Sequence, residues 1–235
     1  MALARQLEPE WLDSLPPTDP RAQASRHDLR LVNRLMGHAS TRRRALANAI
    51  ATTPPHRIIE LGAGDAALML ALARDWPKHS PPPQLVLLDR LDSVDPAVSA
   101  GLAALGWEAK VVTADVFDWL AERQPSATDW VLANLFLHHF SHQQLTGLLQ
   151  LLATRTTLFL ATEPRRSGFA LAASHLLGLV GCNAVTRHDA VVSVRAGFRD
   201  TELSALWPRQ DDWCLSEGDT GLFTHYLLAR RHQPQ

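Results

Sequence analysis

The chain has 235 residues, of which 46% are apolar, and this is enough for one large α/β domain with a buried core. The formal net charge of −1 gives no electrostatic reason to expect nucleic acid as a partner. The two cysteines, Cys182 and Cys214, are too few for a disulfide framework, so we expect a reducing, cytoplasmic location. Neither an apolar leader nor a run of about 18 uncharged apolar residues is present, which predicts no signal peptide and no membrane span.

The chain is predicted to consist of a helical N-terminal extension, residues 1–52, and a main domain, residues 53–235. Residues 1–25 contain several prolines and are expected to be a loosely structured lead-in. Residues 26–52 have apolar side chains at helical spacing, and the arginines on the opposite side are interpreted as a solvated face. These arginines are Arg26, Arg30, Arg34, Arg42, Arg43 and Arg44.

A short buried strand, a glycine turn and a helix are predicted over residues 57–76. The apolar run Ile58 to Leu61 lies between prolines and glycines, which is typical of a buried strand. Gly62 and Gly64 have no β-carbon, so the backbone of the turn can come close to a ligand. The following residues have helical spacing, and free N–H groups at the start of such a helix can hold a nucleotide.

Two cofactors are compatible with this turn. As Gly62-x-Gly64-x-x-Ala67 it fits the loose dinucleotide fingerprint, in which a pyrophosphate lies on the helix N-terminus. As Glu60-x-Gly-x-Gly-x-Ala66 it resembles motif I of the class I S-adenosylmethionine-dependent methyltransferases, with Ala66 in place of the third glycine. A carboxylate two residues before the first glycine is well placed beside a sulfonium and badly placed beside a pyrophosphate. The charge of Glu60 therefore favours the methyl donor.

Two further strands, residues 84–89 and 109–113, are each followed by an acidic residue. An acidic side chain at the position of Asp89, with Arg90 directly after it, can accept both hydroxyls of a ribose, which NAD and the methyl donor share. Asp115 resembles the family position that reaches the adenine amino group, and Val116 the position that packs on the ring. Acidic residues at three successive strand ends are a methyltransferase pattern, and the dehydrogenase template does not require the third.

The fourth strand, residues 129–134, leads into the block Asn134-x-x-x-His138-His139-Phe-Ser141. Ser141 and the glutamine three residues later predict a capping box at the start of a helix. The block resembles the corresponding region of ubiquinone/menaquinone-type and related small-molecule methyltransferases. That resemblance implies that Asn134 contacts the donor and that the histidines lie near the acceptor. The predicted donor-binding residues are Glu60, Gly62, Ala63, Gly64, Asp89, Arg90, Asp115, Val116 and Asn134.

The resemblance covers residues 55–230 and implies a Rossmann-like, doubly wound α/β fold with a seven-stranded sheet and helices on both faces. The fifth strand is predicted at residues 156–163, and a final hairpin of residues 213–217 and 222–229 supplies the antiparallel last strand. Residues 169–180 are apolar on nearly every side and too short to span a bilayer, so we expect a lid helix over a hydrophobic pocket. The family also implies that the N-terminal helices cap the active site.

Methyl transfer from a sulfonium is an in-line displacement with an excellent leaving group, so positioning and exclusion of water are the main tasks of the protein. The spacing of the histidines and acidic residues predicts no metal site. A hydroxyl nucleophile benefits from a base, and His139 and His188 are the predicted catalytic residues. His138 is expected to point away from the side that His139 faces.

The resulting prediction is an enzyme that transfers the methyl group of S-adenosylmethionine to a small, largely apolar acceptor and releases S-adenosylhomocysteine (SAH). The acceptor is expected to be a phenol, quinol or polyketide-like compound of secondary metabolism, and O-methylation is favoured over C-methylation. Two alternatives remain open, an NAD-binding Rossmann oxidoreductase and a catalytically silent partner subunit with the same fold. The strand-four end lacks the motif that holds a flipped base, which argues against a nucleic-acid substrate. The sequence does not indicate an oligomeric state.

Overall fold

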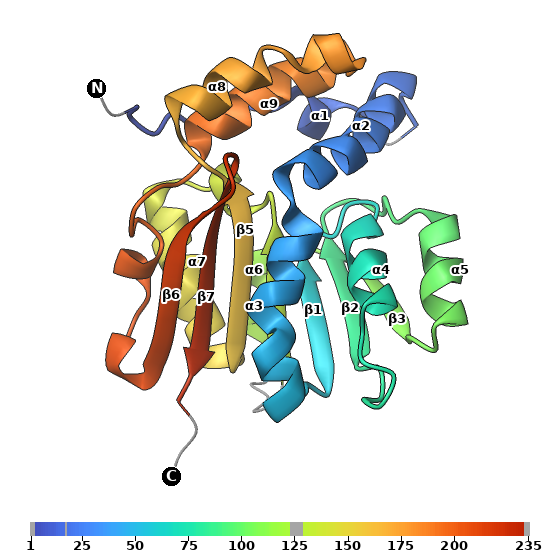
Figure 1. The fold of residues 1–235 in the computed structure, drawn as a ribbon, viewed down its shortest axis with the longest axis vertical. Helices are drawn as coiled ribbons and strands as arrows, with labels where there is room; N and C mark the ends of the chain where they lie inside the picture. The colour runs from blue at the N-terminus through green and yellow to red at the C-terminus, as the bar shows by residue number, and fades with distance from the viewer. Residues whose placement is uncertain (1–2, 17, 123–128, 233–235) are drawn as a thin grey trace.

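A computed structural model describes residues 3–16, 18–122 and 129–232. Its centre is one seven-stranded sheet with the strand order β3-β2-β1-β4-β5-β7-β6. The first five strands are parallel, and β7 runs antiparallel to both β5 and β6. Helices cover both faces of the sheet, as Figure 1 shows. The predicted doubly wound α/β fold with an antiparallel last strand is confirmed.

The strands are short and lie close to the predicted positions. Three of the predicted ranges agree with the structure residue for residue, whereas the fifth strand begins two residues later and the strands of the final hairpin are longer. The bounds are β1 (Arg57–Leu61), β2 (Gln84–Asp89), β3 (Ala109–Thr113), β4 (Asp129–Asn134), β5 (Leu158–Pro164), β6 (Trp213–Thr220) and β7 (Thr224–Arg231).

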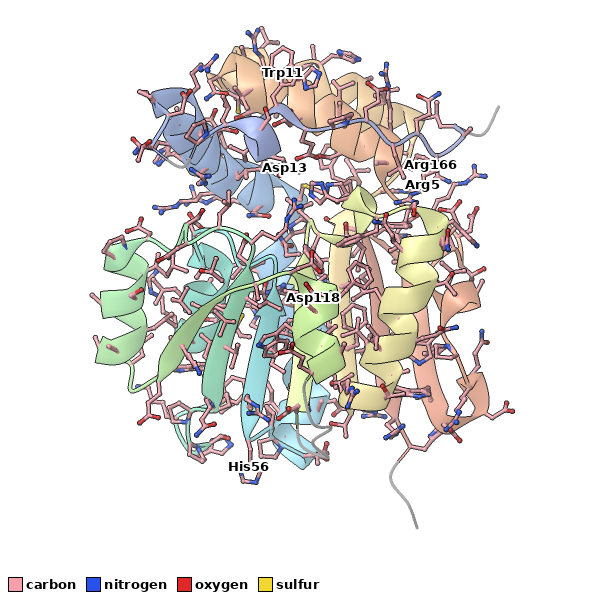
Figure 2. The ribbon with its side chains drawn as sticks, turned by 180° about the vertical axis from the view of Figure 1, so that it is seen from behind. Arg5, Trp11, Asp13, His56, Asp118 and Arg166 are labelled. Carbon is pink, nitrogen blue, oxygen red and sulfur yellow. The ribbon has the colours of Figure 1, made fainter. Side chains whose placement is uncertain are left out.

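Alternating side chains of the strands build a separate core on each face of the sheet. On one face Ile58, Leu87 and Leu132 are fully buried beneath helices α3 (His38–Thr52), α4 (Ala67–Arg74) and α5 (Pro96–Ala104). On the other face Ile59, Val131 and Phe159 are fully buried beneath α6 (Val116–Glu122) and α7 (His142–Arg155). Because both faces are covered, the central strands are apolar at successive positions rather than at every second one. Figure 2 shows the second face, with α6 and α7 in front of the strands.

The N-terminal segment is more ordered than predicted. A short helix, α1 (Trp11–Ser14), lies within the expected lead-in, and α2 (Pro20–Met36) begins before residue 26 because Asp19 caps it. Gly37, with φ +71°, ends α2 and separates it from α3, so residues 26–52 form two helices rather than one. Leu46 of α3 is fully buried in the sheet core, whereas α1 and α2 contact the C-terminal part of the chain.

Helices α1, α2, α8 (Gly168–Ser174) and α9 (Ala184–Ala196) form a layer above the carboxyl ends of the parallel strands, which we call the cap (Figure 1). The predicted single lid helix over residues 169–180 is wrong in detail. It consists of α8 and a separate 3₁₀ turn, η2 (Leu177–Val180). Helix α9 begins at Ala184, because the side chain of Asn183 caps it.

The remaining connections agree with the sequence. Ser141 and Gln144 form the predicted capping box at the start of α7. A 3₁₀ turn, η1 (Leu137–His139), joins β4 to that helix, and η3 (Ser204–Leu206) and η4 (Gln210–Asp212) precede the final hairpin. The polar sequence of residues 122–128 predicts the end of the helix after β3, and residues 123–128 lie outside the described residues. Among the described residues, none of the helices has the length and apolar character that a membrane crossing requires.

Candidate functional site

The carboxyl ends of β1, β2, β3 and β4 border a groove made of two cavities that share part of their walls. The outer groove cavity, of about 330 Å³, lies beside β2, β3 and the start of η1, and the inner groove cavity, of about 180 Å³, lies beside the glycine turn. The residues that line both are Asp13, Gly62, Asp89 and Leu135. Ligands of doubly wound sheets bind at this edge, where the strand order reverses next to the first strand.

All nine residues predicted to bind the donor line this groove. The outer cavity is lined by Gly62, Asp89, Arg90, Asp115 and Val116. The inner cavity is lined by Glu60, Gly62, Ala63, Gly64, Asp89 and Asn134. The topology therefore brings together the strand-end residues that the sequence places far apart.

The glycine turn has the conformation for which glycine is needed. Gly62 has φ +65°, and a β-carbon there would lie 2.5 Å from the ring of Phe136. Gly64 has φ +53°, and a β-carbon there would meet no atom within 4 Å, so its backbone faces open space. Ala66, at the position of the family's third glycine, also has a positive φ of 59° and is buried. The left-handed region is unfavourable for an alanine, so the turn retains glycine-like geometry even where the glycine is missing.

Asp89 and Asp115 stabilise the local backbone as well as lining the groove. The carboxylate of Asp89 accepts hydrogen bonds from the backbone N–H groups of Gly64, at 2.9 Å, and Leu91, at 3.1 Å. Asp115 accepts one from the N–H of Phe117, at 2.8 Å, at the start of α6. A carboxylate has about four lone-pair positions, so each group retains acceptor capacity toward a ligand.

Glu60 does not stand free in the groove. Its carboxylate forms a bidentate ion pair with Arg42 of α3, with distances of 2.7 and 3.0 Å, and both side chains are almost completely buried. Burial raises the pKa of Glu60, and the ion pair with Arg42 offsets part of that increase. The interpretation of Arg42 as part of a solvated helix face is therefore wrong. Because Arg42 neutralises the Glu60 carboxylate, the charge of Glu60 is weaker evidence for a sulfonium ligand than the sequence indicates.

A chain of hydrogen bonds fixes Asn134 at the bottom of the groove. Its Oδ1 accepts from the hydroxyl of Thr162 at 2.7 Å, and its Nδ2 donates to Oδ1 of Asn33 at 3.0 Å. The same Asn33 oxygen accepts from Nδ1 of His38, at 2.8 Å, which assigns the proton of that ring to Nδ1. Leu135, the next residue, has φ +50° and lines both groove cavities. Such backbone geometry is rare for leucine and is held by the surrounding structure.

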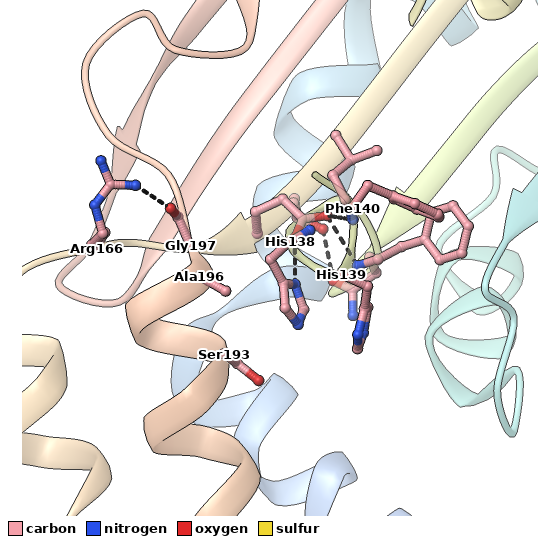
Figure 3. A network of polar contacts seen from close by, with 12 residues as sticks. His138, His139, Phe140, Arg166, Ser193, Ala196 and Gly197 are labelled. Atoms are coloured by element: carbon pink, nitrogen blue, oxygen red, sulfur yellow. Dashed lines mark hydrogen bonds and ion pairs between the residues drawn. The ribbon is translucent and has the colours of Figure 1, made fainter. Parts of the chain in front are cut away.

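His138 and His139 lie in η1, directly above the groove. Their ring centroids are 4.2 Å apart, and Figure 3 shows the two rings side by side and pointing in the same direction. The expectation that His138 points away from His139 is therefore wrong, because the tight 3₁₀ turn places the two side chains on one side. His139 lines the outer groove cavity, as predicted.

His138 is held between two carboxylates. Its Nδ1 lies 2.8 Å from Glu163 at the end of β5, and its Nε2 lies 3.2 Å from Glu10. Glu163 is fully buried and also accepts from the backbone N–H groups of Phe136 and Leu137. The hydroxyl of Ser193 donates to Glu10.

The electrostatics of this group follow from burial and pairing. Burial by itself would lower the pKa of His138, but the hydrogen bonds to Glu10 and Glu163 outweigh it and raise the pKa to about 9. Burial would raise the pKa of Glu10, but the contacts with His138 lower it to about 2. Burial and the neighbouring His138 lower the pKa of His139. One imidazole is therefore protonated and the other neutral near pH 7.

His188, the second predicted catalytic residue, is not brought to the groove. Its ring stacks on Trp11 at 3.9 Å, its Nδ1 lies 2.9 Å from Asp189, and it lines neither groove cavity. The role of His188 in this structure is to support α1 against α9.

The N-terminal strap, residues 3–14, closes one side of the site. Asp189 of α9 accepts hydrogen bonds from the backbone N–H groups of Trp11 and Leu12, at 2.8 and 3.0 Å. Arg5 donates to backbone carbonyls at the end of η1 and at the end of α9, and Figure 2 labels it next to Arg166 on this side of the cap. The strap thereby places Glu10 and Asp13 in the walls of the site.

A third cavity of about 280 Å³, the cap cavity, lies between α2, α8, η2 and α9. Most of its wall is apolar, including Leu29, Val32, Ala173 and Leu177. It shares Leu135 and Glu10 with the outer groove cavity, so the two chambers meet beside the histidine pair.

Three solved structures illustrate what the chain is similar to. An O-methyltransferase family protein from Burkholderia thailandensis has 16% identity and a TM-score of 0.54, covering 91% of this chain and 63% of its own. The plantazolicin methyltransferase BpumL, in complex with a pentazolic desmethylPZN analog and SAH, has 12% identity and a TM-score of 0.60, covering 92% and 93%. The mitomycin 7-O-methyltransferase MmcR has 19% identity and a TM-score of 0.54, covering 94% and 60%.

These similarities show that the chain has the class I methyltransferase fold. No protein-family model and no curated protein sequence matches it. The chain spans 63% of the length of the Burkholderia protein and 60% of the length of MmcR, whereas it spans nearly all of BpumL. The resemblance to quinone methyltransferases in particular remains a prediction.

Four residues of the site are missed by reasoning from sequence. Glu163 offers a signal, since it is an acidic residue at a strand end like Asp89. Arg42 offers one too, because it lies four residues before the buried Leu46 on the same helix face. Glu10 and Asn33 carry no comparable pattern, because cap contacts rather than local sequence bring them to the groove.

Proposed function

We propose that the chain is an S-adenosylmethionine-dependent methyltransferase that methylates a hydroxyl group of a small, largely apolar acceptor. The observation that carries the proposal is that all nine residues expected from motif I and the following strand ends line one continuous groove. The position of β7 between β5 and β6, antiparallel to both, supports the same assignment over a dinucleotide-binding sheet.

The residues of the groove fit the parts of the proposed donor. The Asp89 carboxylate would accept the ribose hydroxyls, and Asp115 with Val116 would hold the adenine in the outer cavity. The glycine turn and Asn134 would hold the methionine part in the inner cavity, where the backbone of Gly64 faces open space. When bound, the donor supplies an electrophilic methyl group on a positively charged sulfur.

The cap cavity is the proposed acceptor site. Its apolar wall favours a hydrophobic ring or chain, and its volume of about 280 Å³ fits a small molecule. Of the polar residues in its wall, Glu10 also lines the outer groove cavity and accepts a hydrogen bond from Ser193, so a hydroxyl of the acceptor would lie at that end, next to the groove. A phenol, quinol or polyketide-like compound satisfies both conditions.

The proposed reaction is an in-line displacement. The acceptor oxygen forms a bond to the methyl carbon, the carbon–sulfur bond breaks, and the electron pair of that bond remains on the sulfur of SAH. The hydroxyl proton passes to His139, which lies in the wall of the outer groove cavity at the side of the cap. The cap would exclude water, and Leu135 lines both the groove and the cap cavity where the reacting groups would meet.

Calorimetric titration of the full chain with SAH and with NAD tests the donor assignment. We expect SAH to bind and NAD not to bind, and we expect Asp89→Asn to weaken SAH binding at least about tenfold, which is about 1.4 kcal/mol. The matched control is Asp92→Asn, since Asp92 is exposed, lies three residues after Asp89 and lines neither groove cavity. Absence of SAH binding, or equal effects of the two substitutions, would contradict the proposal.

A further inference from the structure

We propose that Glu10, His138 and His139 form a binding site for one divalent transition-metal ion, with zinc as the ion that its donors fit best. Each of the three side chains offers one ligand atom, and these atoms all lie within 4.8 Å of one another. Two imidazole nitrogens and one carboxylate oxygen are a donor set that binds zinc in proteins and leaves a further coordination position open.

The separations agree with coordination to one ion. Ligand atoms arranged tetrahedrally at about 2.0–2.1 Å from zinc are about 3.3 Å from one another. The Glu10 oxygen and Nε2 of His138 are 3.2 Å apart. The His139 ring lies beside that of His138, at 4.2 Å between centroids and with an interplanar angle of 32°. The His139 side chain is 28% exposed, and a modest rotation of it would bring a ring nitrogen to the same ion as the Glu10 oxygen and Nε2 of His138.

The structure behind the histidines supplies the second observation. Nδ1 of His138 donates to the buried carboxylate of Glu163, at 2.8 Å, which orients Nε2 toward Glu10, and zinc binding would displace the proton that Nε2 carries in the metal-free protein. A carboxylate that accepts from the far nitrogen of a metal-binding histidine is the usual support of such ligands. Glu163 is itself fixed by backbone N–H groups of Phe136 and Leu137, so the orientation of the ring is preset.

The sequence offers no sign of this site because its members are brought together by the strap. Glu10 lies 128 residues before His138 and reaches it only because the strap is bound to α9. Asp13, also on the strap, lies 3.6 Å from Nδ1 of His139 and adds a second carboxylate at the edge of the group.

The place of the ion between the two chambers gives it a role in the proposed reaction, and this part of the inference rests on the proposed function. Glu10 lines both the outer groove cavity and the cap cavity. A hydroxyl of the acceptor bound at the open position of the ion becomes more acidic. Its proton passes to Asp13, the oxygen attacks the methyl carbon, and the carbon–sulfur electron pair remains on SAH. The ion would then take over the task assigned to His139 in the metal-free protein.

Metal binding is measured directly on the full chain, stripped with a chelator, by titration with zinc and by the visible spectrum of the cobalt(II) form. We expect one ion per chain, an affinity at least about tenfold weaker in His139→Ala and Glu10→Gln, and an affinity about 10–100-fold weaker in Glu163→Gln. The matched control is His142→Ala, an exposed histidine three residues along the chain, which should bind zinc as the unaltered protein does.

The two proposals fail independently in this experiment. SAH binding and the far-ultraviolet circular dichroism spectrum of each variant are recorded alongside, so loss of folding is recognised as such. If SAH binds and zinc does not, the metal site is refuted and the methyltransferase proposal stands. Equal zinc affinity of His139→Ala and His142→Ala would also refute the site, since the ion would then bind elsewhere. If zinc binds as expected and SAH does not, the metal site stands and the donor assignment fails.

Discussion

Gly62 and Gly64 allow the geometry of the glycine turn to be tested with a matched pair of substitutions. Both glycines have a positive φ, +65° and +53°, so an alanine at either position has the same backbone cost. They differ in what the added methyl group meets. At Gly62 it would lie 2.5 Å from the Phe136 ring, and at Gly64 it would meet no atom within 4 Å.

The expected magnitudes follow from these contacts. The left-handed conformation costs an alanine about 1–2 kcal/mol, and the stiffer unfolded chain returns about 0.4–1 kcal/mol, so Gly64→Ala should lower the free energy of unfolding by about 1 kcal/mol. Displacing Phe136 adds about 1–3 kcal/mol for Gly62→Ala. In a chain of this size, about 2–4 °C of melting temperature correspond to each kcal/mol, so Gly62→Ala should melt about 4–16 °C below the unaltered protein.

Differential scanning calorimetry of the two variants, alone and each combined with Phe136→Ala, separates the cost of the backbone conformation from the cost of displacing the Phe136 ring. Removing the ring should make Gly62→Ala about as mild as Gly64→Ala, whereas the cost of Gly64→Ala should not change. Equal losses of stability in the two single variants, or no energetic coupling between Gly62→Ala and Phe136→Ala, would refute the close approach on which the reasoning depends.

Two further predictions concern buried groups beside the groove. Arg42→Met leaves the Glu60 carboxylate buried without its ion-pair partner, so urea denaturation should show a loss of about 3–5 kcal/mol, while Arg43→Met at an exposed neighbouring position should cost less than about 1 kcal/mol. Burial, followed by the charge of Arg42, lowers the pKa of His38 from 6.5 to about 3, so the folded state holds this ring neutral. The neutral His38 ring contributes fully to the free energy of unfolding above pH 6.5, and this contribution should be lost as the pH falls toward 3. Relative to His38→Gln, the loss should reach up to about 1.4 kcal/mol per pH unit. A difference in unfolding free energy between the two proteins that does not change with pH would be inconsistent with a buried neutral ring.

The parallel sheet can be predicted because its strands carry a local pattern. Strands buried on both faces are largely apolar runs, and the predicted bounds of one of them, Gln84–Asp89, agree with the structure. The same feature makes the groove predictable, since the carboxyl ends of neighbouring parallel strands meet at one edge. Ala66, which replaces the third glycine of the motif, has a positive φ of 59° like Gly62 and Gly64.

The parts that cannot be predicted depend on contacts between distant segments. The spacing of Arg42 from Leu46 places the two on one helix face, but only the packing of α3 on the sheet shows that Arg42 pairs with Glu60. His138 and His139 differ in charge state because Glu10 and Glu163 flank one of them, and Glu10 comes from a segment with no recognisable motif. The position of His188 away from the groove cavities could not be predicted, because its stacking on Trp11 has no signature in the sequence.

The strap has a thermodynamic consequence for the order in which ligands bind. Residues 10–13 contribute to the walls of the inner groove cavity, the outer groove cavity and the cap cavity together. A donor and an acceptor that each prefer one position of this segment must change each other's affinity by the same factor, because such linkage is reciprocal. For such a pair of ligands the strap, residues 3–14, would couple the two chambers, and shortening or tethering it should uncouple the affinity for one ligand from the presence of the other.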